Sequence, residues 1–157
     1  MSKKYNKGFV LGKFMPPHKG HIYFIEEALK QTEELYILVC SLKAQPIAGE
    51  LRYEWMKELF PKSKVVHVTD ENPSYPHEHP DFWSFWVRTV RNNTPSDIEV
   101  VFTSENYGEE MAAQLGIKHV LVDKERKVVP VSATMVRNDP QRYLDFLPEN
   151  VRKNFEL

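Results

Sequence analysis

Two histidines, His18 and His21, stand three positions apart in a stretch that also contains Lys13 and Lys19. Imidazole and ammonium groups hold phosphate oxygens and stabilise the negative charge that develops when a phosphoanhydride bond breaks. Ligation of a metal by the two histidines is a weaker interpretation, because no cysteine and no third ligand at a recognisable spacing accompanies them. The residue types therefore favour phosphate chemistry.

The residues on either side of this stretch predict how it is positioned. An apolar run over residues 9–11 predicts a strand, and apolar residues at helical spacing predict a helix that begins at Gly20. Two consecutive prolines, Pro16 and Pro17, fix the turn between the two. In an open α/β sheet this junction lies at the carboxyl edge, where ligands bind, and a helix N-terminus attracts anions. Gly20 leaves room for a ligand to approach the main chain. We therefore expect a polyphosphate cradle here.

A second candidate phosphate site follows a short apolar run near the C-terminus, in the stretch V-S-A-T-M-V-R over residues 131–137. Ser132 is a good N-cap residue for a short helix. Arg137 falls about one and a half turns later, and its guanidinium can hold two phosphate oxygens at once. Taken alone, the same pattern also fits a capped helix with a solvated arginine.

Strand-like and helix-like runs alternate along the chain, which predicts a doubly wound parallel sheet of the Rossmann-like α/β class with a helical C-terminal segment. The expected strands cover residues 7–14, 34–41, 64–69, 97–103 and 117–122. The expected helices cover residues 20–32, 50–60, 80–92, 105–115, 132–137, 141–146 and 149–155. Gly116 is a good helix stop. Two long loops, over residues 42–49 and 70–79, are of the kind that often forms lids or specificity loops.

Composition limits the classes of protein to consider. The 157 residues suit one domain over residues 1–157, and a net charge of −1 gives no global field that would attract nucleic acid. Cys40 is the single cysteine; it excludes an internal disulfide and, within an apolar run, fits a core residue. The N-terminus lacks the apolar region of a signal peptide, and no run is long enough to span a membrane. We expect a cytoplasmic protein that binds neither nucleic acid nor membranes.

The first stretch resembles the H-x-G-H signature of the nucleotidyltransferase superfamily, here His18-Lys19-Gly20-His21 within the longer pattern G-[KR]-F-x-P-x-H-x-G-H. The second stretch resembles the I-S-x-T-x-I-R motif of the same superfamily, with valine at both isoleucine positions. Both motifs occur in the superfamily's order. A nucleotidyltransferase moves a nucleoside monophosphate from a nucleoside triphosphate to a phosphate-bearing acceptor.

Within the superfamily, Lys13-Phe14 in place of Thr-Phe-Asp is unlike the cytidylyltransferase and pantetheine-phosphate branches. The chain resembles nicotinamide mononucleotide adenylyltransferases, particularly that half of the bacterial bifunctional NAD-regulator proteins. The further marks of this resemblance are Y-P-H at 75–77, D-F-W-S at 81–84, F-T-S-E at 102–105, H-V-L-V-D at 119–123, and R-Y at 142–143 with L-P at 147–148. Because the sequence stops at Leu157, we expect neither a ribosylnicotinamide kinase nor a repressor activity.

The resemblance implies roles for residues at the matching positions. The catalytic residues would be His18, His21, Lys13 and Arg137, with His21 nearest the α-phosphate of ATP and Arg137 on the β- and γ-phosphates. The remaining ATP-binding residues would be Gly12, Phe14, Gly20, Ser132, Thr134 and Ser104. A helix cap would also explain Ser104. Mg²⁺ would arrive with ATP, and the protein itself would hold no metal.

An acceptor with a pyridine ring needs an aromatic face, which Trp83 or Trp86 would supply by cation–π attraction. The sequence leaves open which of the two stacks on the ring, and core packing is an equal alternative for either. Arg52 resembles a family arginine near the acceptor, with a solvated helix arginine as the alternative. A metal site at His77-Glu78-His79 is disfavoured, because ligands this close together rarely form a site without partners.

The leading hypothesis is therefore the synthesis of NAD from nicotinamide mononucleotide and ATP. One alternative keeps the reaction and changes the acceptor to nicotinate mononucleotide or another phosphorylated compound. Another is a nucleotide-binding sensor with weak turnover, which need not keep the full set of His18, His21 and Arg137. Homo-oligomerisation, which many relatives show, is left open by the sequence.

Overall fold

The fold is built on a single parallel sheet of five strands in the order β3-β2-β1-β4-β5. We describe it from a computed structural model, which covers residues 3–122 and 127–156. Asp123, which belongs to one of the motifs above, and Leu157 lie outside the described residues. The chain runs outward from β1 to β2 and β3, and then returns to the other side of β1 to form β4 and β5. The fold class expected from the sequence is confirmed.

The strands and helices alternate as the apolar runs predict. The strands are β1 (Tyr5–Gly12), β2 (Thr32–Cys40), β3 (Lys64–Val68), β4 (Val100–Thr103) and β5 (Lys118–Leu121). The helices between them are α1 (Lys19–Gln31), α2 (Gly49–Leu59), α3 (Phe82–Asn93) and α4 (Tyr107–Leu115). A short 3₁₀ helix, Pro76–Glu78, lies in the loop between β3 and α3. The C-terminal segment contains α5 (Ala133–Asn138), a 3₁₀ segment (Pro140–Phe146) and α6 (Glu149–Arg152).

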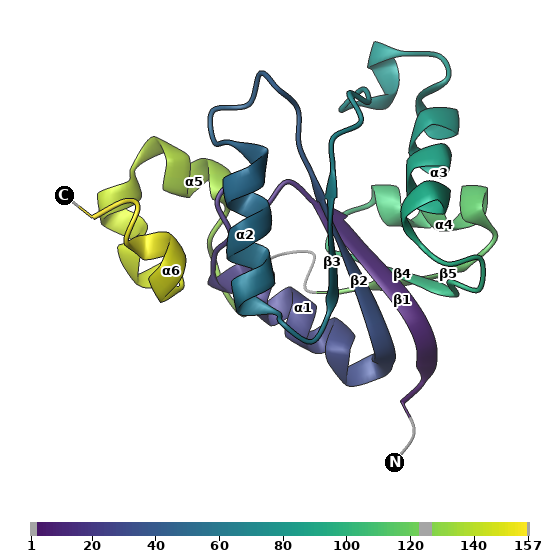
Figure 1. The fold of residues 1–157 in the computed structure, drawn as a ribbon, viewed down its shortest axis with the longest axis horizontal. Helices are drawn as coiled ribbons and strands as arrows, with labels where there is room; N and C mark the ends of the chain where they lie inside the picture. The colour runs from purple at the N-terminus through teal and green to yellow at the C-terminus, as the bar shows by residue number, and fades with distance from the viewer. Residues whose placement is uncertain (1–2, 123–126, 157) are drawn as a thin grey trace.

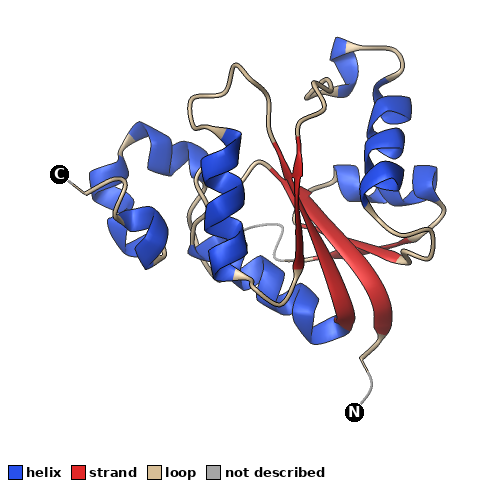
Figure 2. Ribbon diagram, viewed as in Figure 1, coloured by secondary structure: helices blue, strands red, loops and turns tan. Residues whose placement is uncertain are grey.

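Helices cover both faces of the sheet, as Figures 1 and 2 show. Helices α1 and α2 pack on one face, and α3 and α4 pack on the other. Because strands in the middle of such a sandwich have no solvent-facing side, Phe9, Val10, Val100 and Val101 are all fully buried. The strand order reverses between β1 and β4, which makes their carboxyl ends the place where a crevice opens.

The C-terminal segment adds a third apolar cluster beside α2. Trp55 of α2 packs with Val131, Val136, Leu147 and Val151, which come from α5, α6 and the segments beside them. This packing places α5 next to the turn after β1, although the two are more than a hundred residues apart in the sequence (Figure 1). The two candidate phosphate motifs are thereby brought to the same region of the molecule.

Several predicted boundaries need correction. β4 begins at Val100, three residues later than expected, and α6 ends at Arg152, three residues earlier. α4 begins at Tyr107 with Asn106 as its N-cap residue, so Ser104 is not a helix cap. Ser132 is a true N-cap: its side chain accepts a hydrogen bond from the Met135 amide.

Gly116 ends α4 in the left-handed conformation, with a φ of 71°, as expected for a helix stop. A non-glycine residue in this conformation costs about 1–2 kcal/mol. We therefore predict that Gly116→Ala lowers the free energy of unfolding by about that amount, measured by urea denaturation. Gln114→Ala, at an exposed position of the same helix, is the control and should change stability by less than about 0.5 kcal/mol. Equal effects of the two substitutions would contradict the assignment.

Candidate active site

One cavity of about 520 Å³ opens at the carboxyl ends of the central strands. Its walls come from the turn after β1, the loops after β2 and β3, the start of α3, the residues after β4, and the start of α5. The cavity brings together twelve of the thirteen candidate residues: Gly12, Lys13, Phe14, His18, Gly20, His21, Trp83, Trp86, Ser104, Ser132, Thr134 and Arg137. Arg52 is the exception among them.

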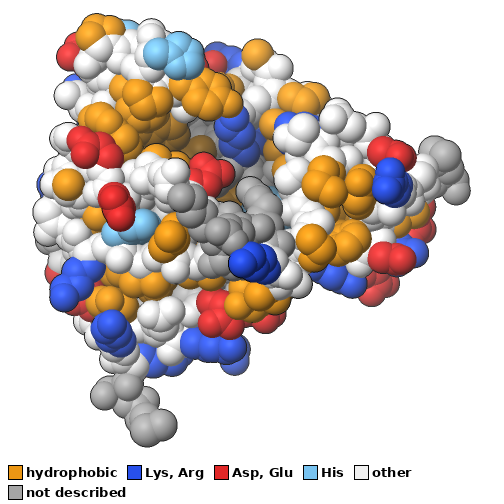
Figure 3. Space-filling model, turned by 180° about the vertical axis from the view of Figure 1, so that it is seen from behind, with side chains coloured by type: hydrophobic (Ala, Val, Ile, Leu, Met, Phe, Trp, Pro, Cys, Tyr) orange, Lys and Arg blue, Asp and Glu red, His pale blue; other side chains and the backbone are white. Residues whose placement is uncertain are grey.

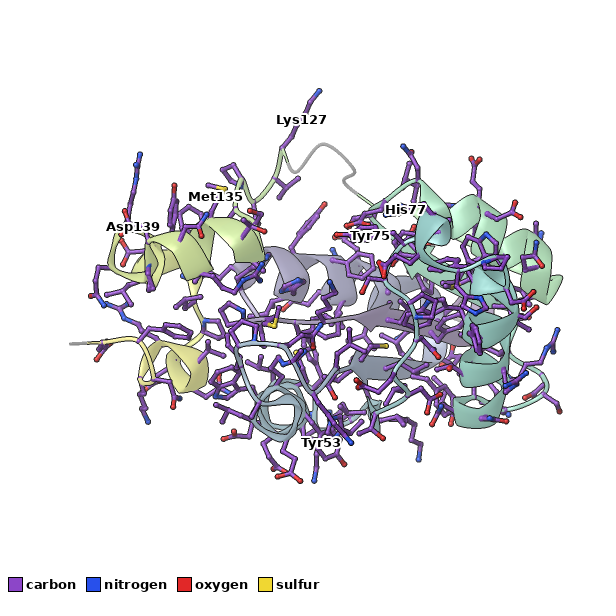
Figure 4. All side chains as sticks on the ribbon, turned by 90° about the horizontal axis from the view of Figure 1, so that it is seen from above. Tyr53, Tyr75, His77, Lys127, Met135 and Asp139 are labelled. Atoms are coloured by element: carbon purple, nitrogen blue, oxygen red, sulfur yellow. The ribbon has the colours of Figure 1, made fainter. Side chains whose placement is uncertain are left out.

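The cavity has two opposite walls. Figure 3 shows a hollowed face with apolar and basic side chains around it. In Figure 4, Tyr75 and His77 lie on the α3 side of the molecule, whereas Met135 lies on α5 across from them. Tyr75 lines the cavity from the loop before α3, and Ala133 and Thr134 line it from α5. The cavity is therefore lined by residues of the α5 side and by aromatic residues of the α3 side.

The two signature histidines cap α1 reciprocally. The Nδ1 atom of His18 accepts hydrogen bonds from the amides of Gly20 (3.0 Å) and His21 (3.3 Å). The Nδ1 atom of His21 accepts in return from the His18 amide at 3.2 Å. A ring nitrogen that accepts a hydrogen bond carries no proton, so each neutral imidazole carries its proton on Nε2. Each ring thus has its donor hydrogen on Nε2, an atom that is buried in His18.

Tight packing keeps the two imidazoles in place. Their rings stack with centroids 3.8 Å apart, and Phe14 packs edge-on against His21 at 4.9 Å. A Cβ atom at Gly20 would come within 2.8 Å of the His18 ring. The close approach expected at Gly20 is therefore made by the protein's own His18 ring. Only 1% of the His18 surface is exposed, so its orientation is fixed before any substrate binds.

Arg137 joins the two motifs directly. Its guanidinium donates hydrogen bonds from Nη1 to the carbonyl oxygen of Met15 (2.6 Å) and from Nη2 to Thr134 Oγ1 (3.3 Å). These contacts use only part of the guanidinium, which has five donor hydrogens. Arg137 is half-buried and lines the cavity, so it combines a fixed position with a charge at the cavity wall.

Arg52 requires a correction, because it is fully buried and does not line the cavity. Its guanidinium donates to the carbonyl oxygens of Ile47 (3.0 Å), Lys13 (2.8 Å) and Cys40 (3.2 Å), and to Gln45 Oε1 (2.8 Å). Burial lowers the pKa of Arg52, but a guanidinium remains protonated at neutral pH. A direct contact with the acceptor would cost these hydrogen bonds. Arg52 instead holds the ends of β1 and β2 and the following loop in place.

Trp83 and Trp86 are both half-buried and both line the cavity. They pack against the apolar cluster between the sheet and α3, so core packing and contact with a ligand are combined in the same residues. The indole Nε1 of Trp86 donates a 2.8 Å hydrogen bond to the Pro73 carbonyl oxygen. Both rings are therefore placed to contact a ligand in the cavity.

The His77-Glu78-His79 stretch uses its polar groups locally. His77 stacks on Tyr75 with centroids 5.7 Å apart, Glu78 accepts from the Tyr75 amide, and His79 accepts from the Asp81 amide. Among residues 3–122 and 127–156, no group of three or more histidine, cysteine, aspartate or glutamate side chains could hold a metal ion.

No helix among the described residues has the length and apolar character needed to cross a membrane.

Several cavity residues were not predicted as site residues from the sequence. Among the polar ones are Ser41, Gln45, Asp70, Asn72, Thr103 and Glu105. Thr103 is the last residue of β4, and the others follow the end of β2, β3 or β4. Because ligands bind at the carboxyl ends of parallel strands, these positions after predicted strands could have identified them as candidates. Cys40 also lines the cavity, and burial raises the pKa of its thiol to about 12, which keeps the sulfur protonated.

The role of Arg52 leads to a stability prediction. Arg52→Lys keeps the charge but cannot reproduce the forked hydrogen bonds, so we expect the free energy of unfolding to fall by about 2–3 kcal/mol in urea denaturation. Glu58→Gln, an exposed change on the same helix, is the control and should have little effect. If Arg52→Lys left stability unchanged and weakened only acceptor binding, the result would contradict this role and support the direct contact with the acceptor that the sequence suggested.

Comparison with known proteins agrees with this geometry. The model of the cytidylyltransferase-like family matches residues 9–139. The chain is 30% identical to the trifunctional NAD biosynthesis/regulator protein NadR of Salmonella typhimurium, over 96% of this chain and 40% of that protein. It is 28% identical to the nicotinamide-nucleotide adenylyltransferase of Pyrococcus furiosus, over 92% of this chain and 80% of that protein.

A crystal structure of NadR in complex with NR shares the fold, with a TM-score of 0.68 and 21% identity over 94% of this chain and 45% of that chain. The chain thus spans less than half the length of the NadR proteins it matches. The matched residues include the end of β1, the histidine pair, Trp83 and Trp86, and Arg137. The chain belongs to the cytidylyltransferase-like family of nucleotidyltransferases.

Proposed function

We propose that this chain transfers the adenylyl group of ATP to nicotinamide mononucleotide, which yields NAD and pyrophosphate. The observation that carries the proposal is the composition of the cavity: the His18–His21 pair and Arg137 line it from the start of α1 and from α5, and Trp83 and Trp86 line it from α3. The first set suits a triphosphate and the second suits a flat, cationic ring. The names of the Salmonella and Pyrococcus relatives support the same activity.

The reaction needs positioning and charge stabilisation more than covalent chemistry. An oxygen of the acceptor's 5′-phosphate attacks the α-phosphorus of ATP, a new P–O bond forms, and the bond to the β-phosphate breaks with release of pyrophosphate. His21 would donate from Nε2 to the α-phosphate, and His18 would support it on the phosphate chain. Lys13 and Arg137 would stabilise the charge that develops on the leaving pyrophosphate. The start of α5, with Ser132 and Thr134, would lie beside the triphosphate.

The adenosine of ATP would lie at the residues after β4. Ser104 lines the cavity there, together with Thr103 and Glu105. Thr103 is nearly fully buried, and its hydroxyl donates to the Glu105 carbonyl oxygen at 3.0 Å. The Thr103 oxygen lies 2.6 Å from Nε2 of His119 on β5. This network fixes the wall against which we place the nucleoside, with Gly12 at the end of the neighbouring strand β1 and Phe14 in the turn after it.

The residues at the cavity fit a metal that arrives with ATP. The histidine pair, Lys13 and Arg137 offer imidazole, ammonium and guanidinium donors to the cavity. Among the residues that the structure describes, no three or more histidine, cysteine, aspartate or glutamate side chains are grouped so that they could hold a metal ion. Mg²⁺ would therefore be held chiefly by the phosphate oxygens, where it would neutralise part of their charge. Lys13 and Arg137 would take up the remaining charge.

A product assay tests the proposed function. The purified chain is incubated with ATP, Mg²⁺ and either nicotinamide mononucleotide or nicotinate mononucleotide, and the products are separated by chromatography. We expect NAD and pyrophosphate in equal amounts, with NAD formed faster than its deamido form. Deamido-NAD as the main product would change the acceptor, and the absence of any dinucleotide with ATP still bound would favour a nucleotide sensor.

His21 provides the sharpest test of mechanism. His21→Ala removes the donor placed nearest the α-phosphate, so we predict that kcat falls at least about 100-fold while the Kd for ATP changes much less. Lys19→Ala is the matched control, because Lys19 is exposed, lies between the two histidines and does not line the cavity. An equal loss of turnover and ATP affinity in the His21 variant would contradict its catalytic role.

A further inference from the structure

Thr89 of α3 holds two polar side chains of the cavity wall. Its hydroxyl donates a 2.6 Å hydrogen bond to Oδ2 of Asp70 and accepts a 2.7 Å hydrogen bond from Nδ2 of Asn72. Thr89 is 1% exposed and does not line the cavity, whereas Asp70 and Asn72 do. A buried hydroxyl on the helix thus determines how two cavity residues are presented.

The donor and the acceptor of each of these hydrogen bonds can be assigned. A threonine hydroxyl has a single hydrogen, and here it goes to Asp70. Asn72 supplies the hydrogen that the Thr89 oxygen accepts. Asp70 therefore acts as an acceptor through Oδ2, and none of the hydrogen bonds among the described residues uses its Oδ1. A carboxylate with acceptor capacity remains at the cavity wall.

This wall is tied to the aromatic end of the cavity. Trp86 and Thr89 are three residues apart, so they lie on the same face of α3. The Trp86 indole donates to the Pro73 carbonyl oxygen, which fastens the same loop that carries Asp70 and Asn72. Ring platform and carboxylate are consequently held by one helix, and Trp83, Trp86, Asp70 and Asn72 all line the same cavity.

We propose that Asp70, held in place by Thr89, makes the acceptor site select a pyridine nucleotide with a carboxamide over one with a carboxylate. This inference rests on the proposed function and identifies the residues that set its acceptor. A carboxamide offers N–H donors to a carboxylate oxygen, whereas a second carboxylate has only acceptors and the same charge. Asp70 is the specificity residue, and Thr89 is a positioning residue that acts through it.

The test compares kcat/KM for nicotinamide mononucleotide and nicotinate mononucleotide in the purified chain with ATP and Mg²⁺. In Asp70→Asn we expect the ratio of the two values to fall at least tenfold, mainly because nicotinate mononucleotide becomes a better acceptor. Asp81→Asn is the matched control: Asp81 stands beside the same helix, is exposed and does not line the cavity, so its ratio should stay within twofold.

Thr89 variants separate positioning from general stability. Thr89→Val keeps the shape but lacks the hydroxyl, and we expect the ratio to fall as in Asp70→Asn, with an unchanged KM for ATP. Thr89→Ser restores the hydroxyl and should restore the ratio. A residue with a merely structural role would lower both kcat/KM values together, so an unchanged ratio in Thr89→Val would overturn the positioning role.

The outcomes distinguish the inference from the function on which it rests. If the wild-type chain forms NAD but Asp70→Asn leaves the ratio unchanged, the inference is overturned and the function stands. The same holds if Asp70→Asn raises only the Mg²⁺ concentration needed for half-maximal rate, since Asp70 would then serve the metal. If no dinucleotide forms from either acceptor, the proposed function fails and the inference fails with it.

Discussion

The turn after β1 depends on two guanidinium groups, one from α2 and one from α5. Arg52 donates to the carbonyl oxygen of Lys13, and Arg137 donates to the carbonyl oxygen of Met15. Between these two carbonyls lies Phe14, whose φ of 49° is uncommon for a residue with a side chain. A strained conformation persists only where its surroundings over-determine it. Because Phe14 packs against His21, this pair of contacts also sets where the signature histidines stand.

Other side chains of the site are also held in place by hydrogen bonds to their neighbours. The histidines cap α1 with their Nδ1 atoms, so the chemistry at Nε2 and the start of the helix are determined together. Arg52 does not line the cavity, yet it holds Lys13 and Gln45, which do. Functional groups at the cavity are thus held by buried residues whose hydrogen bonds are already made, which is how an enzyme lowers the cost of organising its site around a transition state.

The sequence was informative where a local pattern has a local cause. The strand–helix alternation, the N-cap at Ser132 and the helix stop at Gly116 all follow from short-range rules, and the structure has them. The burial of Arg52 could not be predicted from the sequence. Helical periodicity indicates which face of α2 a residue lies on, but not that backbone carbonyl groups of other segments will meet its guanidinium. Thr89 was missed for a related reason: a threonine inside a helix gives no sign that residues 70 and 72 will meet its hydroxyl from another element.

The proposed role of the two histidines depends on their tautomer, and ¹⁵N NMR of their imidazoles tests it most directly. Spectra of the chain with and without a non-hydrolysable ATP analogue, at a pH where free imidazoles are neutral, would assign the proton on each ring. We expect both His18 and His21 to carry the proton on Nε2 before ligand binding, with the analogue shifting the Nε2 resonances and leaving the Nδ1 resonances nearly unchanged. A proton on Nδ1 of either ring, or an analogue that binds without perturbing either imidazole, would contradict the central claim.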